Sequence, residues 1–174
     1  MDERSSDPRS SVLASRSAGF VVASVGALLM GVGATATWIT VGIPDESAHT
    51  MIRGTDLTDG VIVLLCAIAV LAAVVVTRIA GSSSARQTLG ALVAIAGLVA
   101  GAIGTGSLVA GKDRDAVVKA LGVPRELWTQ FGAFRSLGPG AYLVVMGGLG
   151  GILGGLLTMA WARSEAEPQD SDIA

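Results

Sequence analysis

Four long stretches without a charged residue constrain this chain more than any other feature of its sequence. They are residues 17–44 (28 residues), 60–77 (18), 87–111 (25) and 136–162 (27). About 20 helical residues, each rising 1.5 Å, cross the hydrocarbon core of a bilayer, so apolar stretches of this length are typical of membrane-spanning helices. The strands of a membrane β-barrel would be segments of about 10 residues with alternating polarity. The pattern therefore excludes a soluble globular domain and a β-barrel.

We expect an all-α fold, a polytopic membrane protein with four transmembrane helices in an antiparallel bundle. The expected spans are about 18–40, 60–77, 88–110 and 140–162. The polar segments 1–16 and 163–174 predict disordered tails. A short polar turn from Arg78 to Arg86 predicts that the second and third spans form a helical hairpin. In the loop 111–137, apolar spacing predicts one or two amphipathic helices, lying in the membrane interface or packing as a lid on the bundle.

The distribution of basic residues predicts the orientation of the chain. Cytoplasmic segments are enriched in Lys and Arg, and the first helix usually dominates this effect. Arg4, Arg9 and Arg16 precede the first span, whereas Arg53 alone follows it before the second. We therefore expect a multi-pass protein of the inner (plasma) membrane with both termini in the cytoplasm. The alternative that the first apolar stretch is a signal peptide, cleaved near the A-T-A sequence at 34–36, stays open.

Glycine is about twice as frequent as the roughly 7% of an average protein, and 20 of the 24 glycines lie in the four charge-free stretches. Small residues four positions apart share a helix face and let another backbone approach closely. The predicted helix-packing residues are Ala27, Gly31, Gly97, Gly101, Gly147, Gly151 and Gly155. These ladders favour packing within the bundle over a docking face for a partner helix. The fourth span carries small residues on two neighbouring faces and could serve both.

The three tryptophans are the expected interfacial anchors, because an indole prefers the headgroup level of a bilayer. Trp38 and Trp161 lie near the ends of the first and fourth spans, and Trp128 lies in the loop between the third and fourth.

Signals of catalysis are weak. His49 with Asp45, Glu46, Asp56 and Asp59 could form a metal or acid-base site, but these residues follow no recognised ligand spacing. A structural reading explains more, since Asp56 or Thr58 can cap the second span. We expect no catalytic residue, no cofactor and no metal.

Transport and nucleic-acid binding find little support either. The spans hold no ionisable residue that could relay an ion, although hydroxyls could line a pore. Those hydroxyls belong to Ser24, Thr35, Thr37, Thr105, Ser107 and Thr158. A net charge of −2 gives no basis for nucleic acid as a partner. Cys66 is the only cysteine, which excludes a disulfide within the chain.

Three short motifs carry a resemblance to small four-helix membrane proteins of actinobacteria. They are Trp-Ile-Thr-Val at 38–41, Gly-Thr-Asp-Leu-Thr-Asp-Gly at 54–60 and Gly-Pro-Gly at 138–140. In length and span order the chain resembles the tryptophan-biosynthesis-associated membrane protein family. The resemblance implies a membrane protein of undefined biochemical role and supplies no catalytic residues.

The sequence thus predicts an integral membrane protein that acts as an accessory or assembly component through helix contacts. Its expected partners are the lipid bilayer and a membrane protein or further copies of itself. The alternative is a small transporter or channel subunit whose pore forms on oligomerisation. An enzyme that uses the outer loops is the third and least supported hypothesis.

Overall fold

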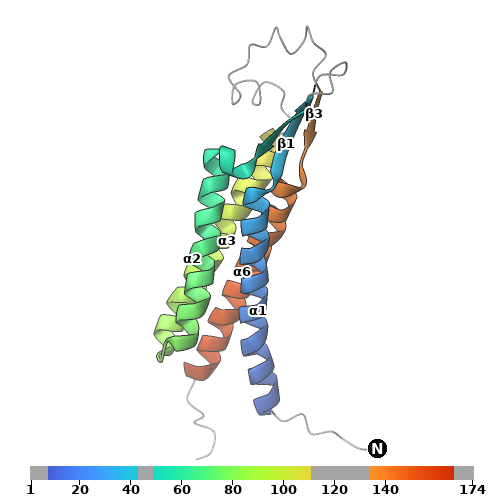
Figure 1. Cartoon of the computed structure of the whole chain (residues 1–174). Coiled ribbons are helices and arrows are strands. Elements are labelled where there is room, and N and C mark those ends of the chain that lie inside the picture. The colour runs from blue at the N-terminus through green and yellow to red at the C-terminus, as the bar shows by residue number, and fades with distance from the viewer. Residues whose placement is uncertain (1–7, 43–48, 111–133, 167–174) are drawn as a thin grey trace, which may run out of the picture.

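Four long helices lie side by side in the computed structural model, which describes residues 8–42, 49–110 and 134–166 (Figure 1). They are α1 (Pro8–Thr35), α2 (Thr58–Ile79), α3 (Ser83–Ala110) and α6 (Pro139–Ala166). Each contains a segment long and apolar enough to cross a membrane. The prediction of four such helices is confirmed.

A small antiparallel β-sheet extends from one end of the helices (Figure 1). Its strands are β1 (Thr37–Gly42), β2 (His49–Arg53) and β3 (Phe134–Leu137), in the order β2-β1-β3. On the central strand, Thr40 pairs with Met51 on one side and with Ser136 on the other. A 3-10 turn, η1 (Gly54–Asp56), joins β2 to α2. The expectation of an all-α fold is therefore wrong for this end of the molecule.

The first and last helices differ from the expected spans at both ends. The charge-free stretch from 17 to 44 contains a helix and a strand, because α1 ends at Thr35 and β1 begins at Thr37. Periodicity alone cannot separate a short apolar strand from the end of an apolar helix. In addition, α1 begins at Pro8, a residue favoured in the first turn, and α6 continues to Ala166, so both helices extend into the segments expected to be tails.

The loop between the third and fourth spans is described only at its end. Phe134 falls in β3, so its place on a predicted helical face is wrong. The rest of the predicted amphipathic segment lies outside the described residues.

Each helix contacts two neighbours: α6 and α2 both lie against α1 and α3. Along the α1–α6 contact, Gly19 lies near Thr158 and Gly33 near Gly140, so these two helices run in opposite directions. The connection from α2 to α3 spans only residues 80–82, and the Ser82 hydroxyl accepts a hydrogen bond from the Ala85 N–H at 3.2 Å. The predicted hairpin of the second and third spans is present.

Buried positions on the helices recur every seven residues. On α2 they are Gly60, Val63, Ala67, Val70, Val74 and Thr77. On α3 they are Gly90, Val93, Gly97, Ala100 and Gly104. Alternating steps of three and four residues keep one stripe facing its neighbours when helices cross at about 20°, as in coiled coils and most four-helix bundles. The outward faces are apolar as well, with exposed leucine, isoleucine and valine along all four helices.

Candidate functional site

The residues considered for a metal site do not come together in the described part of the chain. Within residues 8–42, 49–110 and 134–166, no three His, Cys, Asp or Glu side chains come together where they could hold a metal ion. Asp45 and Glu46 lie outside these ranges. The Asp56 carboxylate accepts a hydrogen bond from the Arg53 N–H at 2.9 Å. Asp56 therefore closes the 3-10 turn, and α2 begins after Leu57 without a side-chain cap.

The most specific feature is a pair of contacts in which backbone meets backbone along α6. We call them the glycine seam. On the side of α1, a Cβ atom added to Gly26 would lie 2.7 Å from the Gly151 nitrogen and 2.8 Å from the Gly147 oxygen. A Cβ atom on Gly33 would lie 2.8 Å from the Gly140 oxygen. Only residues without a side chain permit these distances, so α1 and α6 are in direct backbone contact.

The opposite side of the seam is formed with α3. A Cβ atom on Gly97 would lie 2.7 Å from both the Gly148 oxygen and the Ile152 nitrogen. A Cβ atom on Gly155 would lie 2.5 Å from the Gly90 oxygen. Helix α6 is thus enclosed by two backbone contacts, one with α1 and one with α3.

The seam includes most of the residues predicted to pack, with one clear exception. Gly97, Gly147, Gly151 and Gly155 lie in close contacts, Ala27 is buried, and a Cβ atom on Gly101 would make an ordinary contact of 3.9 Å with Gly148. Gly31 lies outside, since a Cβ atom there would meet nothing within 4 Å. Small residues spaced four apart on α1 follow a line that rotates away from α6 toward Gly31, because the residues of α1 that contact α6 are spaced seven apart.

Several seam residues were missed by the search for spacings of four. They are Gly19, Gly26, Gly33, Gly90, Gly104, Gly140 and Gly148. Their signal is a spacing of seven, present in three sets of three, at 19, 26 and 33, at 90, 97 and 104, and at 140, 147 and 154, and in the pair 148 and 155. A seven-residue repeat of small residues would have identified both faces of α6 from the sequence.

Trp38 closes the end of the seam that lies under the sheet. Its indole Nε1 donates a hydrogen bond of 2.8 Å to the Gly33 oxygen, and the residue is 2% exposed. A Cβ atom on Gly140 would lie 2.5 Å from Trp38 Cδ1, and one on Gly54 would also clash with the indole. The ring therefore occupies a pocket that Gly54 and Gly140 leave open, and the Gly33 carbonyl accepts its N–H. These protein contacts hold the indole in place, and its predicted role as an interfacial anchor stays a prediction.

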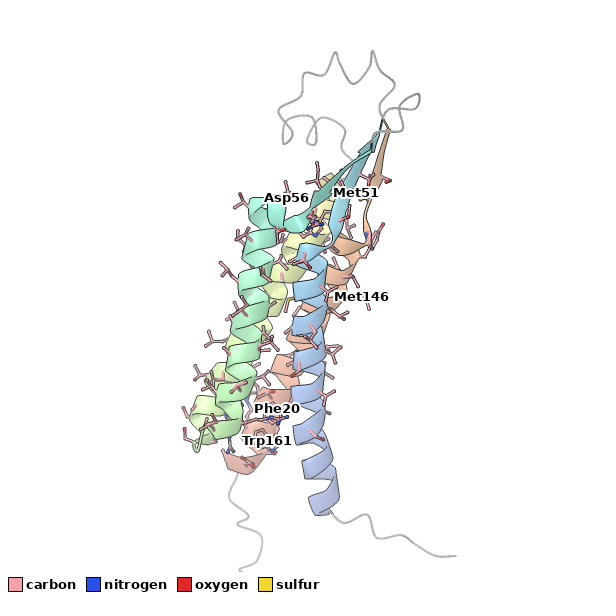
Figure 2. All side chains as sticks on the ribbon, viewed as in Figure 1. Phe20, Met51, Asp56, Met146 and Trp161 are labelled. Atoms are coloured by element: carbon pink, nitrogen blue, oxygen red, sulfur yellow. The ribbon has the colours of Figure 1, made fainter. Side chains whose placement is uncertain are left out.

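Trp161 lies at the other end of the helices, in a cluster that joins all four. Its ring makes an edge contact with Phe20 of α1 at a centroid distance of 6.1 Å, and both residues are labelled in Figure 2. The Arg86 guanidinium of α3 lies 4.8 Å from the Trp161 ring, and that of Arg78 on α2 lies 5.4 Å from the Phe20 ring. Arg86 also forms an ion pair of 2.6 Å with Glu165. We call these five residues the basal cluster. Trp161 is 3% exposed.

The third expected anchor, Trp128, lies outside the described residues. Two hydroxyls considered as pore-lining groups bond to their own helices. Thr35 donates to the Val32 oxygen at 3.0 Å, and Thr158 donates to the Gly154 oxygen at 2.8 Å. Such bonds satisfy a hydroxyl within an apolar helix.

Comparison of the chain with models of known protein families finds no match, and comparison with curated proteins finds none either.

We predict that Gly147→Ala destabilises the protein, because the new methyl group would lie 2.6 Å from the Gly26 oxygen and the Met30 nitrogen. Backbone cannot move aside as a flexible side chain can, and overpacking of this kind costs about 1–3 kcal/mol. The matched control is Gly31→Ala, where the methyl group has open space and helix propensity rises by about 1 kcal/mol. Denaturant titration in detergent should show the first variant unfolding earlier than wild type and the second no earlier. Equal midpoints for the two variants would contradict the seam.

We predict that Trp38→Ala lowers the free energy of unfolding by about 3–5 kcal/mol, the range for truncating a buried aromatic side chain. The change removes both the ring and its hydrogen bond to Gly33. Met51→Ala, on β2 and 65% exposed, is the control and should stay within about 0.5 kcal/mol of wild type. Thermal unfolding in detergent measures both, and a Trp38→Ala variant as stable as the control would rule out the pocket.

Proposed function

We propose that this chain is a multi-pass integral protein of the plasma membrane, with both termini in the cytoplasm. In this proposal it acts as an accessory or assembly component that binds a membrane partner through its helices, and it carries no catalytic site.

The outward faces of the four helices support insertion into a bilayer. Leu28, Leu65, Leu98 and Leu153, one on each helix, are all more than half exposed. Contiguous apolar surface of this extent is rare on soluble monomers, whereas in a bilayer it faces hydrocarbon. The 22 residues of α2 measure about 33 Å at 1.5 Å per residue, which matches the hydrocarbon core of about 30 Å.

The glycine seam is the observation that carries the accessory role. Because α6 touches the backbones of α1 and α3 on both sides, these two interfaces are closely packed, which favours an accessory role over a pore within one chain. The side chains that fill the remaining interior are apolar and fully buried, among them Met30, Val63 and Val144. A rigid, closed bundle suits a protein whose task is to hold its surface in place.

Glycines that do not take part in the contacts between the helices mark where a partner helix would approach. A Cβ atom on Gly31 of α1, or on Gly106 of α3, would meet nothing within 4 Å. Both lie on helix faces that the bundle does not use, and a glycine on such a face lets another backbone come close. The partner is a transmembrane helix of another protein or of a second copy.

The relationship to the tryptophan-biosynthesis-associated membrane protein family stays a prediction based on the three motifs. Under it, the chain would share that family's span order and its undefined role.

We predict that Gly31→Leu and Gly106→Leu leave the protein folded in the membrane fraction but reduce the size of the complex seen after cross-linking in native membranes. The reason is that leucine fills the notch that a partner helix would enter. Gly81→Leu, in the connection between α2 and α3 where nothing lies within 4 Å, is the matched control and should leave the complex unchanged.

Three results would contradict the proposed role. The complex could have the same size in all three variants, or the wild-type chain could form no complex. Solute flux through liposomes containing the purified protein would be the third, and it would favour the pore-forming alternative.

A further inference from the structure

The contact between α1 and α2 is looser than the glycine seam. Helix α2 contains a single glycine, Gly60, at the end near the sheet, so further along α2 side chains keep the helices apart. Toward the basal cluster, α1 diverges from α2 (Figure 1). There a groove of about 480 Å³ opens between them. It is lined by Ser24, Leu71, Val74, Val75, Arg78 and Ile79.

The lining of this groove is apolar except at the Ser24 hydroxyl and at its end, where Arg78 lies. The Arg78 guanidinium lies 5.4 Å from the Phe20 ring centroid, a cation–π contact that orients the group without neutralising it. Arg86, the neighbouring cation of the basal cluster, is by contrast paired with Glu165 and also donates to the Ala80 oxygen. Among the described residues no carboxylate pairs with Arg78. Within the part of the chain that the structure describes, the groove therefore ends in a positive charge without a paired carboxylate.

We propose that this groove binds an anionic phospholipid, with its phosphate on Arg78 and an acyl chain lying between α1 and α2. The inference rests on the proposed insertion into a bilayer. A planar guanidinium can donate two parallel hydrogen bonds to phosphate oxygens, which gives both energy and orientation. Leu71, Val74 and Val75 offer the chain an apolar wall, and the volume falls within the range of about 300–1,000 Å³ typical of ligand pockets.

Position and charge favour a lipid with a net negative headgroup. Arg78 lies in the last turn of α2, beside the polar connection to α3, where a headgroup would meet the helix end. In the proposed orientation this end faces the cytoplasmic leaflet, whose anionic lipids attract basic residues. The lining contains no carboxylate that could pair with a choline ammonium group, so phosphatidylglycerol should bind in preference to phosphatidylcholine.

Native mass spectrometry of the purified full chain in detergent tests the proposal, with phosphatidylglycerol and phosphatidylcholine of identical acyl chains as probes. Wild type should retain one phosphatidylglycerol molecule in preference to phosphatidylcholine. Arg78→Gln should weaken that binding about fivefold, the effect of removing one cation near a charged membrane surface. Arg163→Gln removes an exposed cation of α6 that does not line the groove, and should leave binding unchanged.

A second variant tests the acyl-chain part of the site while keeping the charge. Ser24→Phe places a ring in the groove and should also weaken phosphatidylglycerol binding. Glycerol phosphate, which carries the charge without chains, should bind far more weakly than the lipid, whereas equal binding would show a phosphate site instead.

Several outcomes would overturn the inference. They are equal retention of the two lipids, equal losses in Arg78→Gln and Arg163→Gln, and binding that neither groove variant changes. Resistance of the protein to carbonate extraction from membranes is measured in parallel. A protein that resists extraction but fails the lipid test refutes the groove alone, whereas one that is extracted refutes the proposed insertion.

Discussion

The direct backbone contact of α6 with α1 and α3 is the constraint on which the rest of the structure depends. In a bilayer the lipid tails are as apolar as leucine, so helices gain nothing by withdrawing apolar side chains from their surroundings. In the proposed bilayer setting, association would come from close van der Waals contact and from weak Cα–H···O bonds, which both need short distances between backbones. Glycines such as Gly26, Gly97 and Gly147 provide those distances, and their spacing of seven keeps them in register along the helices.

The two ends of the molecule are arranged around this contact. At one end, Gly54 and Gly140 leave the space in which the Trp38 indole lies, and its hydrogen bond to Gly33 helps fix the strand that follows α1 against α6. At the other end, the rings of Phe20 and Trp161 meet in a T-shaped contact, with an arginine over each ring. Helix α2, which makes no glycine contact with α6, is held less closely and leaves the groove beside α1. The positions of the glycines therefore explain why α6 lies in close contact with α1 and α3, and why a groove is left between α1 and α2.

The sequence allowed the helices to be predicted because lipid imposes a simple requirement: charge must be absent over a span's length. The same requirement makes β1 indistinguishable from the end of a helix in the sequence, since Trp38, Ile39 and Thr40 are uncharged and continue the apolar stretch of α1. Aromatic and β-branched residues there favour a strand, but pairing with β2 and β3 depends on segments distant in the chain. A spacing of four selected Gly31, which lies outside the seam, and missed Gly26, which lies within it. The groove depends on how far α1 and α2 diverge, and the pairing of Arg86 but not of Arg78 with a carboxylate depends on how the helix ends are placed. No local sequence pattern predicts either arrangement.

Disulfide cross-linking in native membranes tests the glycine seam most directly, in a Cys66→Ala background. Gly19→Cys with Thr158→Cys joins α1 to α6, where a Cβ atom on Gly19 would lie 3.2 Å from the Thr158 hydroxyl oxygen. Gly90→Cys with Met159→Cys joins α3 to α6 in the same way, and Val21→Cys with Thr158→Cys, on the outward face of α1, is the control. The seam predicts that both contact pairs form disulfides within one chain and that the control does not. Failure of either contact pair, or cross-links that form only between chains, would show that α6 does not lie in backbone contact between α1 and α3.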